Sequence, residues 1–282
     1  MRNPYRTQNI AFFLLLLATL LIVVPVGLIV VIIIQKGMPA INWQFLTDIP
    51  RQGMRAGGIF PAIVGTLYLV TGAILFALPI GLLAAIYLSE YSKDNILSRM
   101  VKLSIVNLAG VPSVVYGLFG LAMFVVFLRF GASILSGSLT LGIMILPIII
   151  TTSREALESV PQSFREVSLS LGASKWQTIR HIVLPNAIPG ILTGTILGLG
   201  RAAGETAPIL FTVAAFYLPQ LPKSVFEQAM ALPYHLYVIS TQVPNVDEKV
   251  RYGTALVLLM IVLAMNLIAI VIRYQFRKRK KW

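Results

Sequence analysis

Two charged residues of opposite sign lie in one of the most apolar parts of this chain. In the stretch GLGRAAGETAP, residues 198–208, Arg201 and Glu205 are four positions apart. On a helix this spacing places both side chains on one face, so they can meet as an ion pair. An unpaired arginine at the middle of a membrane costs about 2.5–3.5 kcal/mol. We therefore expect the pair to form and to point into the protein.

Two roles for this pair stay open from the residues alone. It can lock a helix bundle, or it can lie on a transport pathway. A planar guanidinium donates two parallel hydrogen bonds to a tetrahedral oxyanion, and the nearby carboxylate would keep binding weak enough for release. Arg154, beside Glu155, is a second candidate for the path of an anion, although it also fits an ordinary anchor at the cytoplasmic face.

The composition defines the class of protein. Of the 282 residues, 57% are hydrophobic and 12% are charged, as in integral membrane proteins and unlike soluble enzymes. The net charge of +13 is spread over short connections between apolar runs, which argues against a nucleic-acid-binding stripe. The chain has no cysteine, and its two histidines have no metal-ligand spacing. We predict no disulfide, no metal site and no catalytic residue.

Six apolar runs are long enough to cross about 30 Å of hydrocarbon. We expect an all-α transmembrane fold, one domain over residues 1–282, with spans at 10–34, 60–88, 105–128, 134–152, 187–216 and 254–273. An even number of spans puts both termini on one side of the membrane. That side holds 15 of the 23 lysines and arginines and the other side holds seven, so both termini are predicted to be cytoplasmic.

The main cytoplasmic connection, residues 153–186, has the signals of short helices. Pro161 fits the first turn of a helix, and Gly172 fits its C-terminal cap. Ser174 opens a capping box with a glutamine three residues later, which starts a second helix that we expect to end at Pro185. The first helix has an apolar face that needs a partner, formed by Phe164, Val167 and Leu171.

This connection resembles the EAA loop of ATP-binding-cassette importer permeases. Glu166 is followed by a glycine six positions later and by Ile-x-Leu-Pro ten positions after that glycine, as in the family motif. Val167 and Ser168 stand where the family usually has two alanines. In that family the first loop helix docks in a cleft of a cytoplasmic ATPase. The resemblance assigns this coupling role to Phe164, Glu166, Val167, Ser168, Leu171, Gly172, Ala173, Ile182, Leu184 and Pro185.

The resemblance also implies partner chains. The sequence has no GxxxxGK[ST] phosphate-binding loop, so this chain is not the ATPase itself. A separate ATPase dimer is expected to bind ATP and Mg²⁺, while this chain binds no cofactor. Because the ATPases work as a dimer, a second permease chain is expected as well.

Further stretches resemble the membrane subunits of high-affinity phosphate importers. They are GVPSVVYGLFGL (110–121), SLGASKWQTIRHIVLPNAIPGI (170–191) and GLGRAAGETAP, and MALPYHLY (230–237) is similar to the A-type subunit. This resemblance implies a six-helix type I importer permease in a bacterial cytoplasmic (inner) membrane, forming half of the translocation pathway. It also implies a C-type sister subunit and an extracytoplasmic phosphate-binding protein that delivers the solute.

Other functions also fit the residues. The same fold can carry another oxyanion, such as sulfate, molybdate or phosphonate. A secondary transporter or channel would use the charged pair for ion coupling without ATP. An intramembrane enzyme is the least favoured, because the spans contain no histidine cluster, no pairing of serine with histidine and no paired acids.

Overall fold

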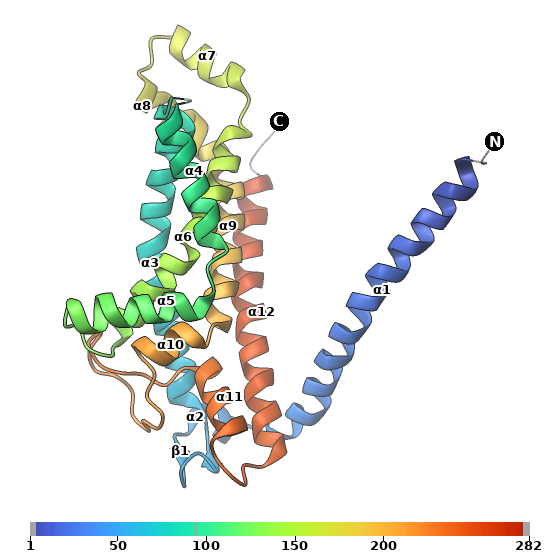
Figure 1. Cartoon of the computed structure of the whole chain (residues 1–282), viewed down its shortest axis with the longest axis vertical. Coiled ribbons are helices and arrows are strands. Elements are labelled where there is room, and N and C mark those ends of the chain that lie inside the picture. The colour runs from blue at the N-terminus through green and yellow to red at the C-terminus, as the bar shows by residue number, and fades with distance from the viewer. Residues whose placement is uncertain (1–3, 94, 279–282) are drawn as a thin grey trace.

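The computed structural model describes residues 4–93 and 95–278, and most of them are helical (Figure 1). The longer helices are α1 (Pro4–Gly37), α3 (Phe60–Ile86), α4 (Ile96–Ala109), α6 (Ile134–Glu158), α9 (Leu184–Gly204), α11 (Leu232–Thr241) and α12 (Glu248–Lys278). Shorter helices are η1 (Met38–Ala40), α2 (Trp43–Thr47), α5 (Ser113–Gly120), α7 (Gln162–Ser170), α8 (Lys175–Thr178) and α10 (Ala207–Thr212). Three π-helical turns, η2 (Tyr87–Tyr91), η3 (Leu121–Phe127) and η4 (Ile179–Val183), and an antiparallel hairpin of β1 (Pro50–Arg51) and β2 (Ala56–Gly57) complete the fold.

Five helical stretches within the described residues are long and apolar enough to cross a membrane, and a bent helix pair makes a sixth candidate. The five are Gln8–Ala40, Phe60–Tyr91, Ile134–Glu158, Lys175–Gly204 and Glu248–Phe276. The bent pair joins Ile96–Ala109 to Ser113–Phe127. Each of the six predicted spans overlaps one of these stretches, so the predicted all-α transmembrane fold is right.

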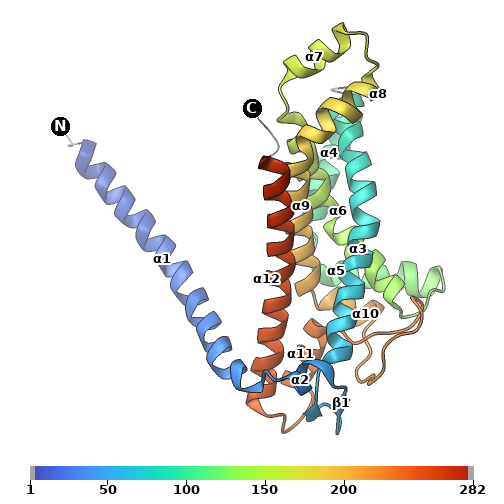
Figure 2. The same cartoon turned by 180° about the vertical axis from the view of Figure 1, so that it is seen from behind.

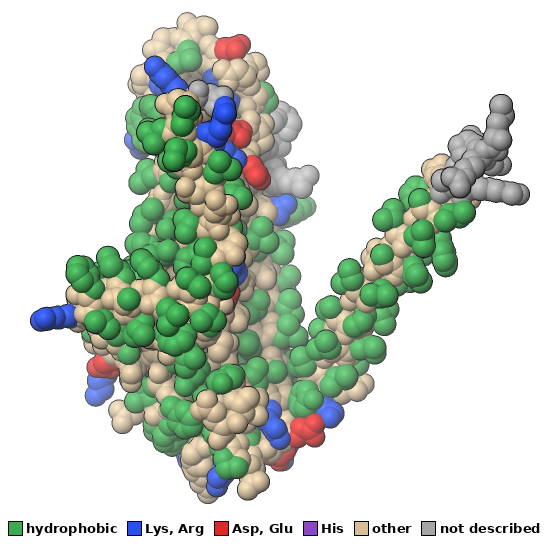
Figure 3. Space-filling model, in the orientation of Figure 1, with side chains coloured by type: hydrophobic (Ala, Val, Ile, Leu, Met, Phe, Trp, Pro, Cys, Tyr) green, Lys and Arg blue, Asp and Glu red, His purple; other side chains and the backbone are tan. Residues whose placement is uncertain are grey.

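The two ends of the bundle differ in what they carry. Helix α7, the start of α1 and the end of α12 lie toward one end, which we call the loop end (Figures 1 and 2). The hairpin, α2 and α11 lie at the opposite end, which we call the cap end. Hydrophobic side chains cover most of the surface between the two ends, and most charged side chains gather toward them (Figure 3). This distribution suits a protein surrounded by lipid.

The third predicted span, 105–128, is wrong as a single straight helix. The chain bends by 101° between α4 and α5. Pro112 precedes α5 with an extended backbone, at φ −58° and ψ 141°. Because proline has no N–H, it cannot continue the hydrogen bonds of α4. The Tyr116 hydroxyl donates to the carbonyl oxygen of Leu108 at 2.7 Å and so adds a side-chain hydrogen bond at the end of α4.

The fifth predicted span, 187–216, begins and ends elsewhere. Helical structure runs from Lys175 to Gly204, so the second loop helix continues into the membrane span and does not end at Pro185. The π-helical turn η4 ends two residues before Pro185. Proline has no N–H, so the regular hydrogen bond to the carbonyl four residues earlier is missing there. At the other end, Pro208 lacks the N–H that would bond to the Gly204 carbonyl. Glu205 is therefore extended, with φ −78° and ψ 138°.

The boundaries of the cytoplasmic connection change accordingly. The predicted segment 153–186 is shorter in the structure, because α6 continues to Glu158 and α8 leads through η4 into α9. Only residues 159–174, which include α7, lie outside these two long helical stretches.

The core forms where α3, α6 and α9 pack against one another. Helix α6 is central, and Leu141, Met144, Ile145 and Ile149 are completely buried on it. Small residues allow close approach: a Cβ added to Gly72 would lie 2.4 Å from the Ser138 hydroxyl of α6. Lipid tails are as apolar as these side chains, so close van der Waals packing holds the helices together.

Helix α1 leans away from the bundle (Figure 2). None of its most apolar 18-residue window is buried within this chain. It is tied to α12 near the cap end, where Lys36 forms a 2.8 Å ion pair with Glu248 and lies over the ring of Tyr252. Most of its apolar surface is thus left to lipid or to another chain.

The cap end is joined to α3 by contacts with the segment that leads into α11. The Leu232 N–H donates to the Thr66 hydroxyl oxygen at 2.8 Å. One residue earlier, a Cβ added to Gly65 would lie 2.0 Å from the Met230 carbonyl oxygen. Nearby on α11, burial lowers the pKa of His235 to about 4, so this side chain is uncharged at neutral pH.

Replacing Gly65 with alanine is expected to lower the thermal stability of the protein. The new methyl group would meet a backbone oxygen at 2.0 Å, and overpacking of this kind costs about 1–3 kcal/mol. The melting temperature of the detergent-purified chain measures this loss. Gly27→Ala is the matched control, since nothing lies within 4 Å of its added Cβ. Equal melting temperatures for the two variants would contradict the close contact.

Candidate functional site

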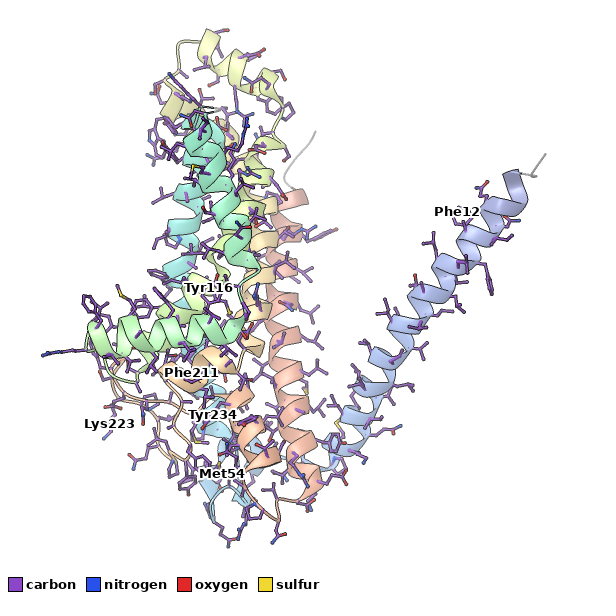
Figure 4. All side chains as sticks on the ribbon, viewed as in Figure 1. Phe12, Met54, Tyr116, Phe211, Lys223 and Tyr234 are labelled. Carbon is purple, nitrogen blue, oxygen red and sulfur yellow. The ribbon has the colours of Figure 1, made fainter. Side chains whose placement is uncertain are left out.

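Two helix breaks face each other close to Arg201. Helix α9 ends at Gly204, and α10, which follows, packs against α5, which follows the bend after α4. Gly117 permits this contact, because an added Cβ would lie 2.7 Å from the ring of Phe211. Tyr116 and Phe211 mark these two elements in Figure 4. Broken helices at membrane depth are found where protein or a water-filled cavity surrounds the freed backbone groups.

Arg201 and Glu205 form the predicted ion pair at this break. The Arg201 Nε lies 3.6 Å from the Glu205 Oε1. Arg201 lies in the last turn of α9 and Glu205 just beyond it, so the pair spans the end of the helix. Their side chains are 30% and 20% exposed on this single chain. The pair therefore reaches a surface that a solute or a second chain can approach.

The geometry of the pair leaves binding capacity on the guanidinium. At 3.6 Å the contact is an ion pair without a short hydrogen bond, so the donors of Arg201 are not used up by Glu205. Tyr116, which lies within electrostatic range of Arg201, already donates its hydroxyl to Leu108. The guanidinium of Arg201 therefore keeps donors that could bind an anion at the break.

Arg154 does not belong to the same site. Its Nε lies 3.8 Å from the Glu158 Oε1, and it lines a small cavity near the loop end. The contact between Gly194 and Thr152 sets the antiparallel register of α9 on α6. In that register Arg201 of α9 lies beside a position on α6 that is roughly nine residues, or about 13 Å, from Arg154. Any anion path that uses both residues must connect two separate positions.

The predicted start and end of the first loop helix and the predicted start of the second are confirmed. Helix α7 starts after Pro161 and ends before Gly172, which has a φ of +86° that favours glycine. The capping box is complete: Ser174 and Gln177 each bond the backbone of the other. The loop is therefore a helix, a glycine turn and a second helix, as its sequence predicts.

The coupling residues are not all exposed. Val167 and Leu171 are 60% and 83% exposed, whereas Phe164 is partly buried against the bundle. The predicted apolar face is thus divided: Phe164 contacts the bundle, and Val167 and Leu171 form an exposed surface. Three of the other coupling residues are exposed: Glu166, Gly172 and Pro185. Four are half-buried: Ser168, Ala173, Ile182 and Leu184.

Sequence reasoning missed an ion pair that ties the loop to the bundle. The Arg165 Nη2 lies 2.7 Å from the Glu90 Oε1, and the two side chains are 12% and 8% exposed. The residues are 75 positions apart, and no local pattern links them. The one signal available was that each is a charged residue beside an apolar segment.

A bundle of membrane-length helices with facing breaks, a charged pair at those breaks and an exposed helical loop at one end defines a membrane transport permease. The chain belongs to the family of binding-protein-dependent transport system inner membrane components, whose sequence model matches residues 77–282. It is a multi-pass membrane protein that works with an ATPase and a substrate-binding protein. The prediction of a transporter subunit that is not an enzyme is confirmed.

Relatives of known name have similar length and similar sequence. A probable ABC transporter permease, YqgI of Bacillus subtilis, is 34% identical over 258 residues, covering 86% of this chain and 87% of the relative. The phosphate transport system permease protein PstA 1 of Mycobacterium tuberculosis is 37% identical, covering 80% and 73%. The probable phosphate transport system permease protein PstA of Methanocaldococcus jannaschii is 35% identical, covering 90% and 88%.

Solved structures share the fold at low sequence identity. A chain of the MetNI methionine ABC transporter, in an inward-facing conformation, aligns with a TM-score of 0.62 at 17% identity, covering 77% of this chain and 97% of that chain. A chain of a bacterial ABC transporter that imports alginate aligns with a TM-score of 0.64, also at 17% identity, covering 99% and 98%. The type I importer permease fold is therefore confirmed.

Proposed function

We propose that this chain is the membrane-spanning permease subunit of an ATP-driven phosphate importer and forms half of its translocation pathway. The observation that carries the proposal is the partly exposed Arg201–Glu205 pair beside facing helix breaks. The similarity to phosphate transport permeases from two organisms supports phosphate as the solute. Guanidinium chemistry is well suited to such an anion, since its planar fork matches two oxygens of a tetrahedral oxyanion.

In this proposal the other half of the pathway is a C-type sister permease. A cytoplasmic ATPase dimer, which carries ATP and Mg²⁺, binds the loop that contains α7. An extracytoplasmic phosphate-binding protein delivers the solute at the cap end. Both termini and the loop are then cytoplasmic, as the excess of lysine and arginine on that side supports, and the membrane is the bacterial inner membrane.

The charged pair gives the pathway an anion site of moderate strength. When the pathway opens toward the binding protein, Arg201 offers its free donors to phosphate. Glu205 stays nearby at 3.6 Å and lowers the positive potential that the anion experiences. This opposing charge allows phosphate to leave when ATP drives the pathway open toward the cytoplasm.

Uptake of radiolabelled phosphate at limiting concentration tests this function. Cells that depend on this chain for phosphate import are expected to lose uptake when it is deleted and to regain it on re-expression. Unlabelled phosphate is expected to compete, whereas sulfate, molybdate and phosphonate are expected to leave uptake unchanged. Competition by one of those anions in place of phosphate would reassign the solute, and uptake that survives ATP depletion would exclude an ATP-driven importer.

A further inference from the structure

Helix α7 stands apart from the bundle and has few connections to it. It projects beyond the ends of the neighbouring helices at the loop end (Figure 1). None of its residues is buried, and its backbone lies closest to α8 and η4, which follow it in the chain. Ser168 shares a 2.9 Å hydrogen bond with Thr178 on that side. A movement of α7 therefore needs another route to reach α3 and α6.

Arg165 supplies such a route. Its Nε and Nη2 donate to the carboxylate of Glu90 at 3.2 and 2.7 Å, and Glu90 lies in η2, the last turn of the α3 span. Its Nη1 donates to the Val160 carbonyl oxygen at 2.7 Å, and its Nη2 donates to that of Leu157 at 2.9 Å. We call these four residues the Arg165 clamp. One guanidinium thus holds α7 to the ends of two membrane helices.

The chemistry of the clamp makes this connection stiff. The carbonyls of Leu157 and Val160 lie at the C-terminal end of α6, where unpaired carbonyls and the helix dipole both favour a cation. All three guanidinium nitrogens have acceptors within the protein, and both charged side chains are almost fully buried. Separating the pair would leave a mostly buried charge without its partner.

The surroundings of the clamp are less tightly packed. A cavity of about 550 Å³ borders it, lined by Ser89, Gln162, Lys175 and other residues of η2, α6, α7 and α8. Beyond the partial packing of Phe164, side-chain bulk does not fill the space between α7 and the ends of α3 and α6. The directed bonds of Arg165 are thus the main mechanical link on this side.

We infer that Arg165 and Glu90 are positioning residues that transmit the movement of the ATPase-docking helix α7 to α3 and α6. The inference rests on the proposed ATP-driven function. The clamp and the exposed face of α7 then have different roles. The exposed face binds the ATPase, and the clamp transmits the movement of α7 to the membrane helices.

The test uses the assembled transporter in proteoliposomes with its ATPase and its binding protein. Basal ATP hydrolysis is compared with hydrolysis stimulated by the solute-loaded binding protein, since stimulation requires a signal that crosses the membrane chains. Arg165→Gln is expected to keep the ATPase bound and basal hydrolysis within about twofold, and to reduce stimulation by at least about tenfold. Arg165→Lys, which keeps the charge but not the fork, is expected to be intermediate. The control Arg180→Gln, at an exposed arginine of η4, is expected to match the wild type.

A covalent replacement for the clamp separates transmission from folding. Because the chain has no cysteine, the double variant Glu90→Cys and Arg165→Cys can be joined selectively by a short bifunctional maleimide, with cysteine-free partner chains. Stimulation is expected to be low before cross-linking and to recover at least about fivefold afterwards. Normal stimulation in Arg165→Gln, loss of the ATPase from that variant, or no recovery on cross-linking would each overturn the inference. Because the readout uses whichever solute the binding protein carries, a failure of phosphate as the solute is distinguished from a failure of the clamp.

Discussion

Replacing Arg201 with glutamine is expected to reduce phosphate uptake by about 100-fold or more while the transporter still assembles. A hydrogen bond to a charged group contributes about 1.5–3 kcal/mol, and the guanidinium fork supplies two of them. Since each 1.4 kcal/mol is a factor of ten, losing both removes at least about two orders of magnitude. Glutamine keeps the arginine stem as far as Cδ and a polar end, so the facing helix breaks stay packed. Radiolabelled phosphate uptake and co-purification of the partner chains measure the two properties.

Two companion variants decide between a transport site and a structural ion pair. Arg154→Gln serves as the matched control, because Arg154 lies about 13 Å along α6 from Arg201 and pairs with a different carboxylate. We expect it to retain most uptake. In the double variant Arg201→Met and Glu205→Met both charges are removed, so a purely structural pair would be replaced without loss. Uptake restored in this double variant would show that the pair only holds the bundle together.

Replacing Leu171 with aspartate is expected to weaken binding of the ATPase by about 30-fold or more and to abolish uptake. Leu171 is 83% exposed, just after α7, so the described residues leave most of its apolar side chain uncovered. A side chain that acts as a binding hot spot contributes about 2 kcal/mol or more, and a buried unpaired charge adds a further penalty. Adding Val167→Asp, at a position 60% exposed, is expected to deepen the loss. The affinity of the purified permease for the ATPase measures the effect.

The control for this prediction lies on the same helix. Ser163 is exposed near the start of α7, and an aspartate there is favoured by the helix dipole. Ser163→Asp is therefore expected to keep both ATPase binding and uptake. Helicity and melting temperature of the Leu171→Asp chain are expected to be unchanged, because the side chain makes little contact within the chain. Unchanged ATPase affinity in that variant would place the docking surface elsewhere.

Together, these two variants and the Arg165 clamp divide the transporter into three separable steps. In the proposed mechanism, the outer face of α7 binds the ATPase, the clamp passes movement to α3 and α6, and Arg201 holds the anion at the helix breaks. Each step has a different readout: ATPase affinity, stimulation of ATP hydrolysis by the binding protein, and uptake. Loss of one readout with the others retained identifies the step that a variant affects.

The sequence by itself determined the features whose causes lie within a few residues. Apolar runs of membrane length predict the spans, because a helix in lipid satisfies all its backbone hydrogen bonds within one segment and needs apolar side chains over that length. The start and end of α7 follow from Pro161 and Gly172, and the start of α8 follows from the capping box at Ser174. Each of these signals acts on the backbone next to it. The pairing of Arg201 with Glu205 follows from their spacing, which brings the side chains together even though the helix ends between them.

The tertiary structure alone decided the features that join distant residues. The 101° bend after α4 depends on how α5 packs against α10, although Pro112 indicates a break. The division of the apolar face into a partly buried Phe164 and an exposed Leu171 depends on where α7 lies on the bundle. The Arg165–Glu90 contact joins positions 75 residues apart. Local signals act through the backbone over about one helical turn, whereas these contacts depend on how the whole bundle packs, and no short stretch of sequence contains that information.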